Sequence, residues 1–213
     1  MQGKNVNIFF AYTSDSMDLL ALAKKQVELL NNSIAGKILF HIREWRTYVK
    51  SEMGRPEDVI LRQMPIPENH LFVGVFRFLY GTPSGNVNPE TGKKFRSAME
   101  EEFSIAYRLW KEHRKPEIMV FRSVERIPPD IPYNYKQLEA LKTFFKEFSA
   151  KGSHPGLYKE FDSKETFSDV FLQGLLSYAV RLIEADTVFH DGLSNVFFDT
   201  DNPMRNQVKQ DAM

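Results

Sequence analysis

Residues 71–80, LFVGVFRFLY, form the most hydrophobic segment of this 213-residue chain and are followed directly by Gly81. A continuous apolar run that ends at a turn residue is typical of a strand covered on both faces of a parallel sheet. We therefore expect a central buried strand here, with helices packed on either side of it.

Strands and helices alternate on both sides of this central run. Short apolar segments predict four further strands, at residues 6–12, 37–45, 117–122 and 157–161. Apolar residues at helical spacing predict the intervening helices, at residues 16–30, 55–64, 95–113, 135–150 and 165–184. This alternation, with right-handed crossovers, predicts an α/β fold: a doubly wound, flavodoxin-like, five-stranded parallel sheet of order 2-1-3-4-5 with helices on both faces.

The periodic pattern covers most of the chain and then lapses. We predict one α/β domain over residues 1–186 and a linker or docking tail over residues 187–213, where no apolar period is sustained. Residues 81–94, GTPSGNVNPETGKK, are rich in glycine, proline and asparagine and predict a long loop. Loops of this length in a compact domain are usually functional or mobile, so we expect this one to cover a site.

Composition excludes several classes of protein. The chain has no cysteine, which rules out disulfides, thiol catalysis and zinc–thiolate sites. Its 28 basic residues balance 28 acidic ones without a basic cluster interleaved with aromatics, so we expect no nucleic-acid partner. No apolar run is long enough to span a bilayer, and the N-terminus lacks the apolar core of a signal peptide. We expect a soluble, cytoplasmic protein with no membrane association.

Familiar catalytic motifs are also missing from the sequence. There is no phosphate-binding loop, no G-x-G-x-x-G turn after the first strand, and no nucleophile elbow around Ser84. The five histidines do not show the spacing of metal ligands. We therefore predict neither a catalytic metal nor a bound cofactor.

The carboxyl ends of parallel strands are where α/β proteins bind their ligands. That rule selects candidate substrate-binding residues just past three predicted strands: Tyr12, Thr13, Ser14, Trp45, Tyr80 and Gly81. The aromatic side chains among them could stack on a base or belong to the core or its rim. The hydroxyl groups could bind a ligand or cap the first helix.

Glu102 stands out on the predicted helix at residues 95–113. At about 100° per residue from Phe95, the apolar residues span an arc from about 300° to about 80°, and Glu102 falls inside it at about 340°. Glu100 and Glu101 fall outside the arc, so we expect them to be solvated and able to pair with bases such as Arg96. A buried carboxylate usually has a partner or a task. The alternative is a slightly rotated helix with Glu102 at a wet margin or paired with an arginine.

Three segments resemble TIR-like domains. Residues 8–15, IFFAYTSD, resemble the first motif of TIR domains, a buried strand that runs into a hydroxyl-rich turn ending in aspartate. Residues 71–81 are similar to a strand of the TIR-like domain found at the N-terminus of bacterial STAND NTPases, and residues 97–116 resemble that family's third helix and the strand after it. The similarity extends over residues 6–184.

The resemblance implies a function and a set of roles. In TIR domains that cleave NAD, and in the related nucleoside deoxyribosyltransferases, a glutamate on this helix acts at the ribose, four residues before a small residue. Glu102, followed by Ala106, matches that spacing and is the implied catalytic residue. Ser97 at the start of the helix joins the substrate-binding candidates, and NAD would be a substrate rather than a cofactor.

The resemblance also implies a cellular setting and leaves alternatives open. It implies an effector in bacterial defence signalling that self-associates and works with a C-terminal NTPase or sensor domain. One alternative is a non-catalytic signalling module in which Glu102 is a buried structural carboxylate. A second is an enzyme like the nucleoside deoxyribosyltransferases.

Overall fold

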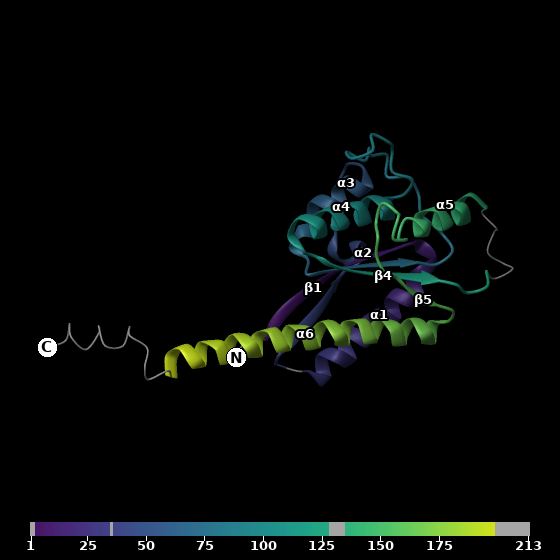
Figure 1. Ribbon diagram of the computed structural model, residues 1–213. Helices are drawn as coiled ribbons and strands as arrows, with labels where there is room; N and C mark the ends of the chain where they lie inside the picture. Colours follow the sequence, from purple (N-terminus) through teal and green to yellow (C-terminus); the bar gives the residue numbers. More distant parts are fainter. Residues whose placement is uncertain (1–2, 35, 128–134, 199–213) are drawn as a thin grey trace. The chain divides into compact units, whose positions relative to one another are not determined.

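A computed structural model describes residues 3–34, 36–127 and 135–198 of the chain (Figure 1). The chain divides into two compact units, Met1–Gly174 and Leu175–Met213. The first unit holds the sheet, the helices that pack on it and the candidate site.

The centre of the first unit is a five-stranded parallel sheet of order β2-β1-β3-β4-β5, as the sequence predicted. The strands are β1 at Lys4–Tyr12, β2 at Ile38–Arg43, β3 at Leu71–Phe76, β4 at Glu117–Ser123 and β5 at Lys159–Phe161. β3 is buried along its whole length between β1 and β4, which confirms the central strand expected from its apolar run.

Helices cover both faces of the sheet, which confirms the predicted doubly wound α/β class (Figure 1). They are α1 at Met17–Ser33, α2 at Trp45–Tyr48, α3 at Pro56–Gln63, α4 at Ala98–His113, α5 at Tyr135–Lys146 and α6 at Lys164–Phe198. The α3, α4 and α5 helices lie on one face, and α1 lies on the other with the beginning of α6.

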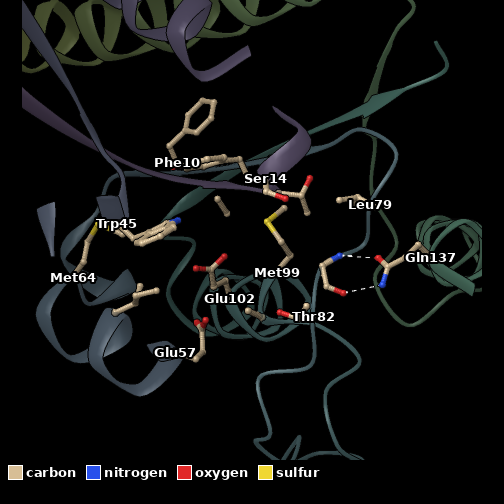
Figure 2. Close-up of a pocket in the computed structure, with 16 residues that line it drawn as sticks. Phe10, Ser14, Trp45, Glu57, Met64, Leu79, Thr82, Met99, Glu102 and Gln137 are labelled. Carbon is tan, nitrogen blue, oxygen red and sulfur yellow. Dashed lines mark hydrogen bonds between the residues drawn. The ribbon is translucent and has the colours of Figure 1, made fainter. Parts of the chain in front are cut away.

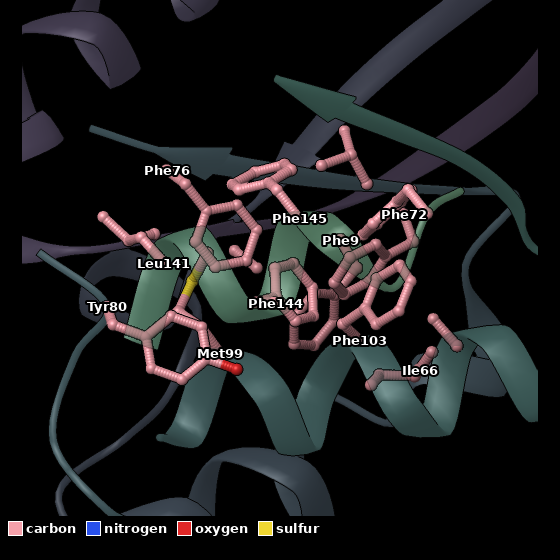
Figure 3. Packing of buried hydrophobic residues seen from close by; sticks show 14 of the residues in the cluster. Phe9, Ile66, Phe72, Phe76, Tyr80, Met99, Phe103, Leu141, Phe144 and Phe145 are labelled. Atoms are coloured by element: carbon pink, nitrogen blue, oxygen red, sulfur yellow. The ribbon is translucent and has the colours of Figure 1, made fainter. Parts of the chain in front are cut away.

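Phenylalanines dominate the core on both faces. On the side of α4 and α5, the Phe72 ring lies 5.7 Å from that of Phe9 and 6.3 Å from that of Phe103, measured between ring centroids (Figure 3). On the other side Phe10 packs against Phe171 of α6 at 6.1 Å. Because side chains alternate along a strand, the neighbouring residues Phe9 and Phe10 of β1 point to opposite faces of the sheet. Each packs in the hydrophobic layer between the sheet and the helices on its own side.

The central strand is shorter than predicted. The expected strand at residues 71–80 ends at Phe76, because the backbone N–H groups of residues 78–81 bond to two side chains instead of a neighbouring strand. Asp15 Oδ2 accepts from the first two at 2.8 and 3.1 Å, and Gln137 Oε1 accepts from the last two at 2.6 and 3.0 Å. The chain therefore turns away from the sheet directly above its carboxyl edge.

The last helix is longer than predicted. α6 continues to Phe198 instead of ending near Glu184. Residues 185–198 contain no proline and a single glycine, so the sequence offers nothing that would stop a helix there. The predicted tail at residues 187–213 is thus helical in its first part, while residues 199–213 lie outside the described chain. The predicted domain boundary at residue 186 stays a prediction.

Candidate functional site

A cavity of about 420 Å³ opens at the carboxyl edge of the sheet (Figure 2). Its walls come from the end of β1 and the turn after it, from α2 and α3, from the loop after β3, and from the first turns of α4 and α5. Small-molecule sites commonly measure about 300–1,000 Å³, and in open α/β sheets they lie at this edge. The cavity thus has the size and the place of a ligand site.

The structure brings six of the eight predicted site residues to this cavity. Those that line it are Tyr12, Thr13, Ser14, Trp45, Gly81 and Glu102. They come from four separate parts of the chain, so the strand order, and not a local sequence motif, brings them together.

Tyr80 and Ser97 are not brought into the cavity wall. Tyr80 is only 1% exposed and packs in the core, with its ring 6.2 Å from that of Phe76 and 5.6 Å from that of Phe144. Ser97 is buried at the N-cap of α4, where its Oγ accepts a hydrogen bond from the N–H of Glu100 at 3.0 Å. Both residues support the elements that carry the site.

Glu102 lies on the inner side of α4 with its carboxylate at the cavity (Figure 2). The residue is 7% exposed, which confirms that it belongs to the buried face of the helix. No hydrogen bond or ion pair joins its carboxylate to any of the described residues. Burial raises the pKa of Glu102 well above its usual range, and the nearby carboxylates of Glu57 and Glu101 raise it further.

Glu57 is a second buried carboxyl group at the cavity, and the sequence analysis missed it. It lies in the first turn of α3, is 6% exposed, and its Oε1 has no hydrogen-bond partner within the described chain. Burial, followed by the charges of Glu101 and Asp58, raises the pKa of Glu57 to about 8.

A signal for Glu57 was present in the sequence. Glu57, Ile60 and Met64 follow one another at three- and four-residue spacing, which places them on one side of a helix, and all three line the cavity. The position of Glu57 in the first turn points instead to a surface role, because a glutamate there is ordinarily solvated and interacts favourably with the helix dipole.

The prediction that Glu101 is solvated was wrong. Glu101 is 6% exposed, because Asn86 from the loop at residues 81–94 lies against it and donates from Nδ2 to Oε1 at 2.8 Å. Its Oε2 has no partner among the described residues. Glu100, in contrast, pairs with Arg96 as expected, with Nη2 and Oε1 2.7 Å apart. Three glutamates are therefore buried close together at the site.

The hydroxyl group of Tyr12 is held by a polar network beside the cavity. It donates to Glu44 Oε2 at 3.1 Å, while Glu44 Oε1 accepts from Lys24 Nζ at 3.0 Å and from Thr47 Oγ1 at 2.7 Å. Burial and then the Glu44 charge raise the pKa of Tyr12, so its hydroxyl stays protonated. Burial alone would raise the pKa of Glu44, but the hydrogen bonds from Thr47 and Lys24 outweigh it and the pKa is lowered.

The remaining lining residues offer hydroxyl groups and an aromatic face. Thr13 is buried and donates from Oγ1 to Asp15, whereas Ser14 is exposed. The expected capping role of Thr13 is not seen, because its side chain makes no cap hydrogen bond to the short 3-10 turn that follows. Trp45 is 41% exposed, and the guanidinium of Arg46 lies 5.1 Å from its ring centroid. One wall of the cavity is therefore an accessible indole.

The described residues show neither a metal-binding cluster nor a membrane-spanning helix. They contain no group of three histidine, aspartate or glutamate side chains arranged to hold a metal ion. In the same part of the chain, none of the helices has both the length and the apolar character needed to cross a membrane.

The fold places the protein in the flavodoxin-like class of doubly wound α/β proteins, with its candidate site at the carboxyl edge of the sheet. No protein-family model matches the chain, and no curated protein is significantly similar to it. The resemblance to TIR-like domains therefore stays a prediction from the sequence motifs.

Proposed function

We propose that this chain is a TIR-like effector domain that cleaves the N-glycosidic bond of NAD or a related nucleotide, with Glu102 acting at the ribose. The observation that carries the proposal is the Glu102 carboxylate, which is buried at a cavity of about 420 Å³ and has no partner among the described residues.

The surroundings of Glu102 favour a role in ligand binding or catalysis over a structural one. Burying a carboxylate without hydrogen bonds costs several kcal/mol. Glu44, a buried carboxylate bonded to the Tyr12 hydroxyl, shows the contrast, because four groups donate to its two oxygens. The cost of burying Glu102 is understandable if a ligand with positive charge completes the site.

Cleavage of an N-glycosidic bond creates such a charge. The transition state resembles a ribose oxocarbenium ion, and a carboxylate nearby can stabilise that cation, bind the ribose hydroxyls or attack the anomeric carbon. Because Glu102 is only 7% exposed, this attraction is stronger than it would be in solvent. The ring faces of Tyr12 and Trp45 could hold the base, and the hydroxyl of Ser14 could bind the sugar or a phosphate.

The rest of the proposal rests on the sequence resemblance. By that resemblance the domain self-associates, cooperates with a C-terminal NTPase or sensor domain, and acts in bacterial defence signalling. If assembly activates the enzyme, the rate per molecule should rise with protein concentration.

The test compares the wild type with Glu102→Gln and with Glu100→Gln as a neighbouring control. Each protein, concentrated or crowded to favour assembly, is incubated with NAD and a mixture of nucleotides, and the consumption of each is followed by mass spectrometry. Glu102→Gln should lose at least about 100-fold in turnover, because one aimed charge typically contributes that much. Glu100→Gln should stay active, because Glu100 binds Arg96 and does not line the cavity.

Other outcomes separate the alternatives. Equal turnover by the wild type and Glu102→Gln would refute the assigned role. No turnover in any condition, with Glu102→Gln changing the melting temperature or the assembly state, would favour the non-catalytic module. Exchange of the base on a free deoxynucleoside would favour an enzyme like the deoxyribosyltransferases.

A further inference from the structure

We infer that Glu57 is the proton donor to the leaving base, and that this cavity therefore accepts neutral purine nucleosides and nucleotides as well as cationic pyridinium N-ribosides such as NAD. The inference deepens the proposed function and rests on it.

The first observation is the placement of two carboxyl groups at one cavity. Glu57 reaches it from α3 and Glu102 reaches it from α4, and the Glu57 carboxyl group points toward the part of α4 that carries Glu102 (Figure 2). Both residues are more than nine-tenths buried. Neither makes an ion pair with any residue that the structure describes, and Glu57 Oε1 also lacks a hydrogen bond there.

The second observation concerns the charges around Glu57. The charged groups that act on Glu57 are both acidic. Glu101 lies on α4, and Asp58 is the next residue after Glu57 on α3. Glu57 in turn acts on Glu102. Like charges that share a buried site cannot both ionise easily, so the pair keeps at least one proton at neutral pH. A cationic ribose beside Glu102 favours the ionised form of that residue and leaves the remaining proton on Glu57. One charged and one protonated carboxyl group are the usual equipment for acid-assisted glycosidic cleavage.

The chemistry of the leaving group decides when that proton is needed. The nicotinamide ring of NAD is already cationic, so it leaves as a neutral molecule when it takes the electrons of the C–N bond. A purine in a neutral nucleoside would leave as an anion. A general acid that protonates the purine removes this charge and typically accelerates such a step by about 10²–10⁴-fold.

The reaction balances with water as the only co-reactant. The C1′–N9 bond breaks, its electron pair goes to the purine, and the Glu57 carboxyl proton passes to purine N7. Water then bonds to C1′ and returns a proton to the Glu57 carboxylate, while Glu102 faces the ribose cation. The products are the free sugar and the neutral purine.

The experiment uses the full chain and two purine substrates of nearly equal size. Guanosine needs protonation to leave, whereas 7-methylguanosine carries a positive charge on its purine at about pH 6 and leaves without it. Glu57→Gln should lower kcat/KM for guanosine by at least about 100-fold more than it lowers kcat/KM for 7-methylguanosine or NAD, because only guanosine needs the proton. Glu102→Gln should lower all three. Retained cleavage of 7-methylguanosine also shows that the Glu57→Gln protein is folded.

Each other outcome overturns a defined claim. If Glu57→Gln lowers cleavage of both purines equally, or leaves guanosine cleavage intact, Glu57 is not the proton donor, while the proposed function stands. If the wild type cleaves NAD but neither purine, the substrate range is wrong. If the wild type cleaves none of the three, this inference falls, and the proposed function falls as well if no nucleotide of the mixture is consumed.

Discussion

Replacing Glu57 by glutamine should stabilise the protein at neutral pH and have little effect in acid. The pKa of Glu57 is about 8 in the folded protein and 4.5 for an ordinary glutamate. Between these two values the folded state holds a proton that the unfolded state has lost. The stability of the wild type therefore falls as pH rises through this window, by about 1.4 kcal/mol per pH unit for this one group.

The size of the effect follows from the same window. From pH 4.5 to pH 7 the accumulated penalty is about 3 kcal/mol, and it becomes complete above pH 8. Glutamine has nearly the shape of the protonated acid and cannot ionise, so Glu57→Gln should avoid this penalty. With a urea m-value of about 2 kcal/mol/M, the unfolding midpoint at pH 7 should rise by about 1.5 M.

The assay is urea unfolding of the wild type and Glu57→Gln at several pH values from 4.5 to 8. The two midpoints should nearly coincide at the acid end and separate as pH rises. Glu100→Gln is the matched control and should shift the midpoint downward, because it removes the ion pair with Arg96. A Glu57→Gln midpoint that is lower than that of the wild type at pH 7, or a separation independent of pH, would refute a raised pKa of Glu57 in the folded protein.

Two further predictions concern Glu44, which holds the Tyr12 hydroxyl, and Trp45, which lines the cavity. Glu44→Gln should destabilise the protein by about 2 kcal/mol at pH 7, because it weakens the hydrogen bonds from Thr47 and Lys24. The pKa of Glu44 is lowered in the folded protein, so its contribution to stability is fully present above its ordinary value of 4.5 and is lost as pH falls through the folded pKa. The unfolding curves of variant and wild type should therefore approach each other as the pH is lowered below 4.5. Trp45→Ala should raise KM about tenfold with kcat little changed, because base stacking typically contributes about 1–3 kcal/mol. The KM of Trp45→Phe should lie between those of the wild type and Trp45→Ala. An unchanged KM in Trp45→Ala would show that Trp45 does not contact the substrate.

The sheet was predictable because each of its strands carries a local signal. The apolar run at residues 71–80 marks the central strand, and the alternation of strands and helices leaves few ways to wind a parallel sheet. The end of β3 was not predictable by this route. The groups that stop it, on Asp15 and Gln137, are distant in the sequence, and a strand's own residues do not show which side chains will reach its last N–H groups.

The candidate site shows the same division. The burial of Glu102 follows from the spacing of its own helix, and its side chain was placed correctly. The burial of Glu101 depends on Asn86, which comes from a loop that a helical projection does not include. The position of Glu57 is predictable in the same way, because a helical projection of α3 places it on the side marked by Ile60 and Met64.

The position of Trp45 makes the cavity observable without knowledge of its ligand. The chain has two tryptophans, and the other, Trp110, lies on α4 away from this cavity, stacked on Tyr107 at 5.7 Å. A Trp110→Phe protein would therefore carry a single tryptophan, in the wall of the candidate site, whose emission can be excited apart from that of the tyrosines. Its emission would report occupancy directly, so nucleotides, nucleosides and free bases could be titrated one by one and ranked by affinity even where no turnover follows.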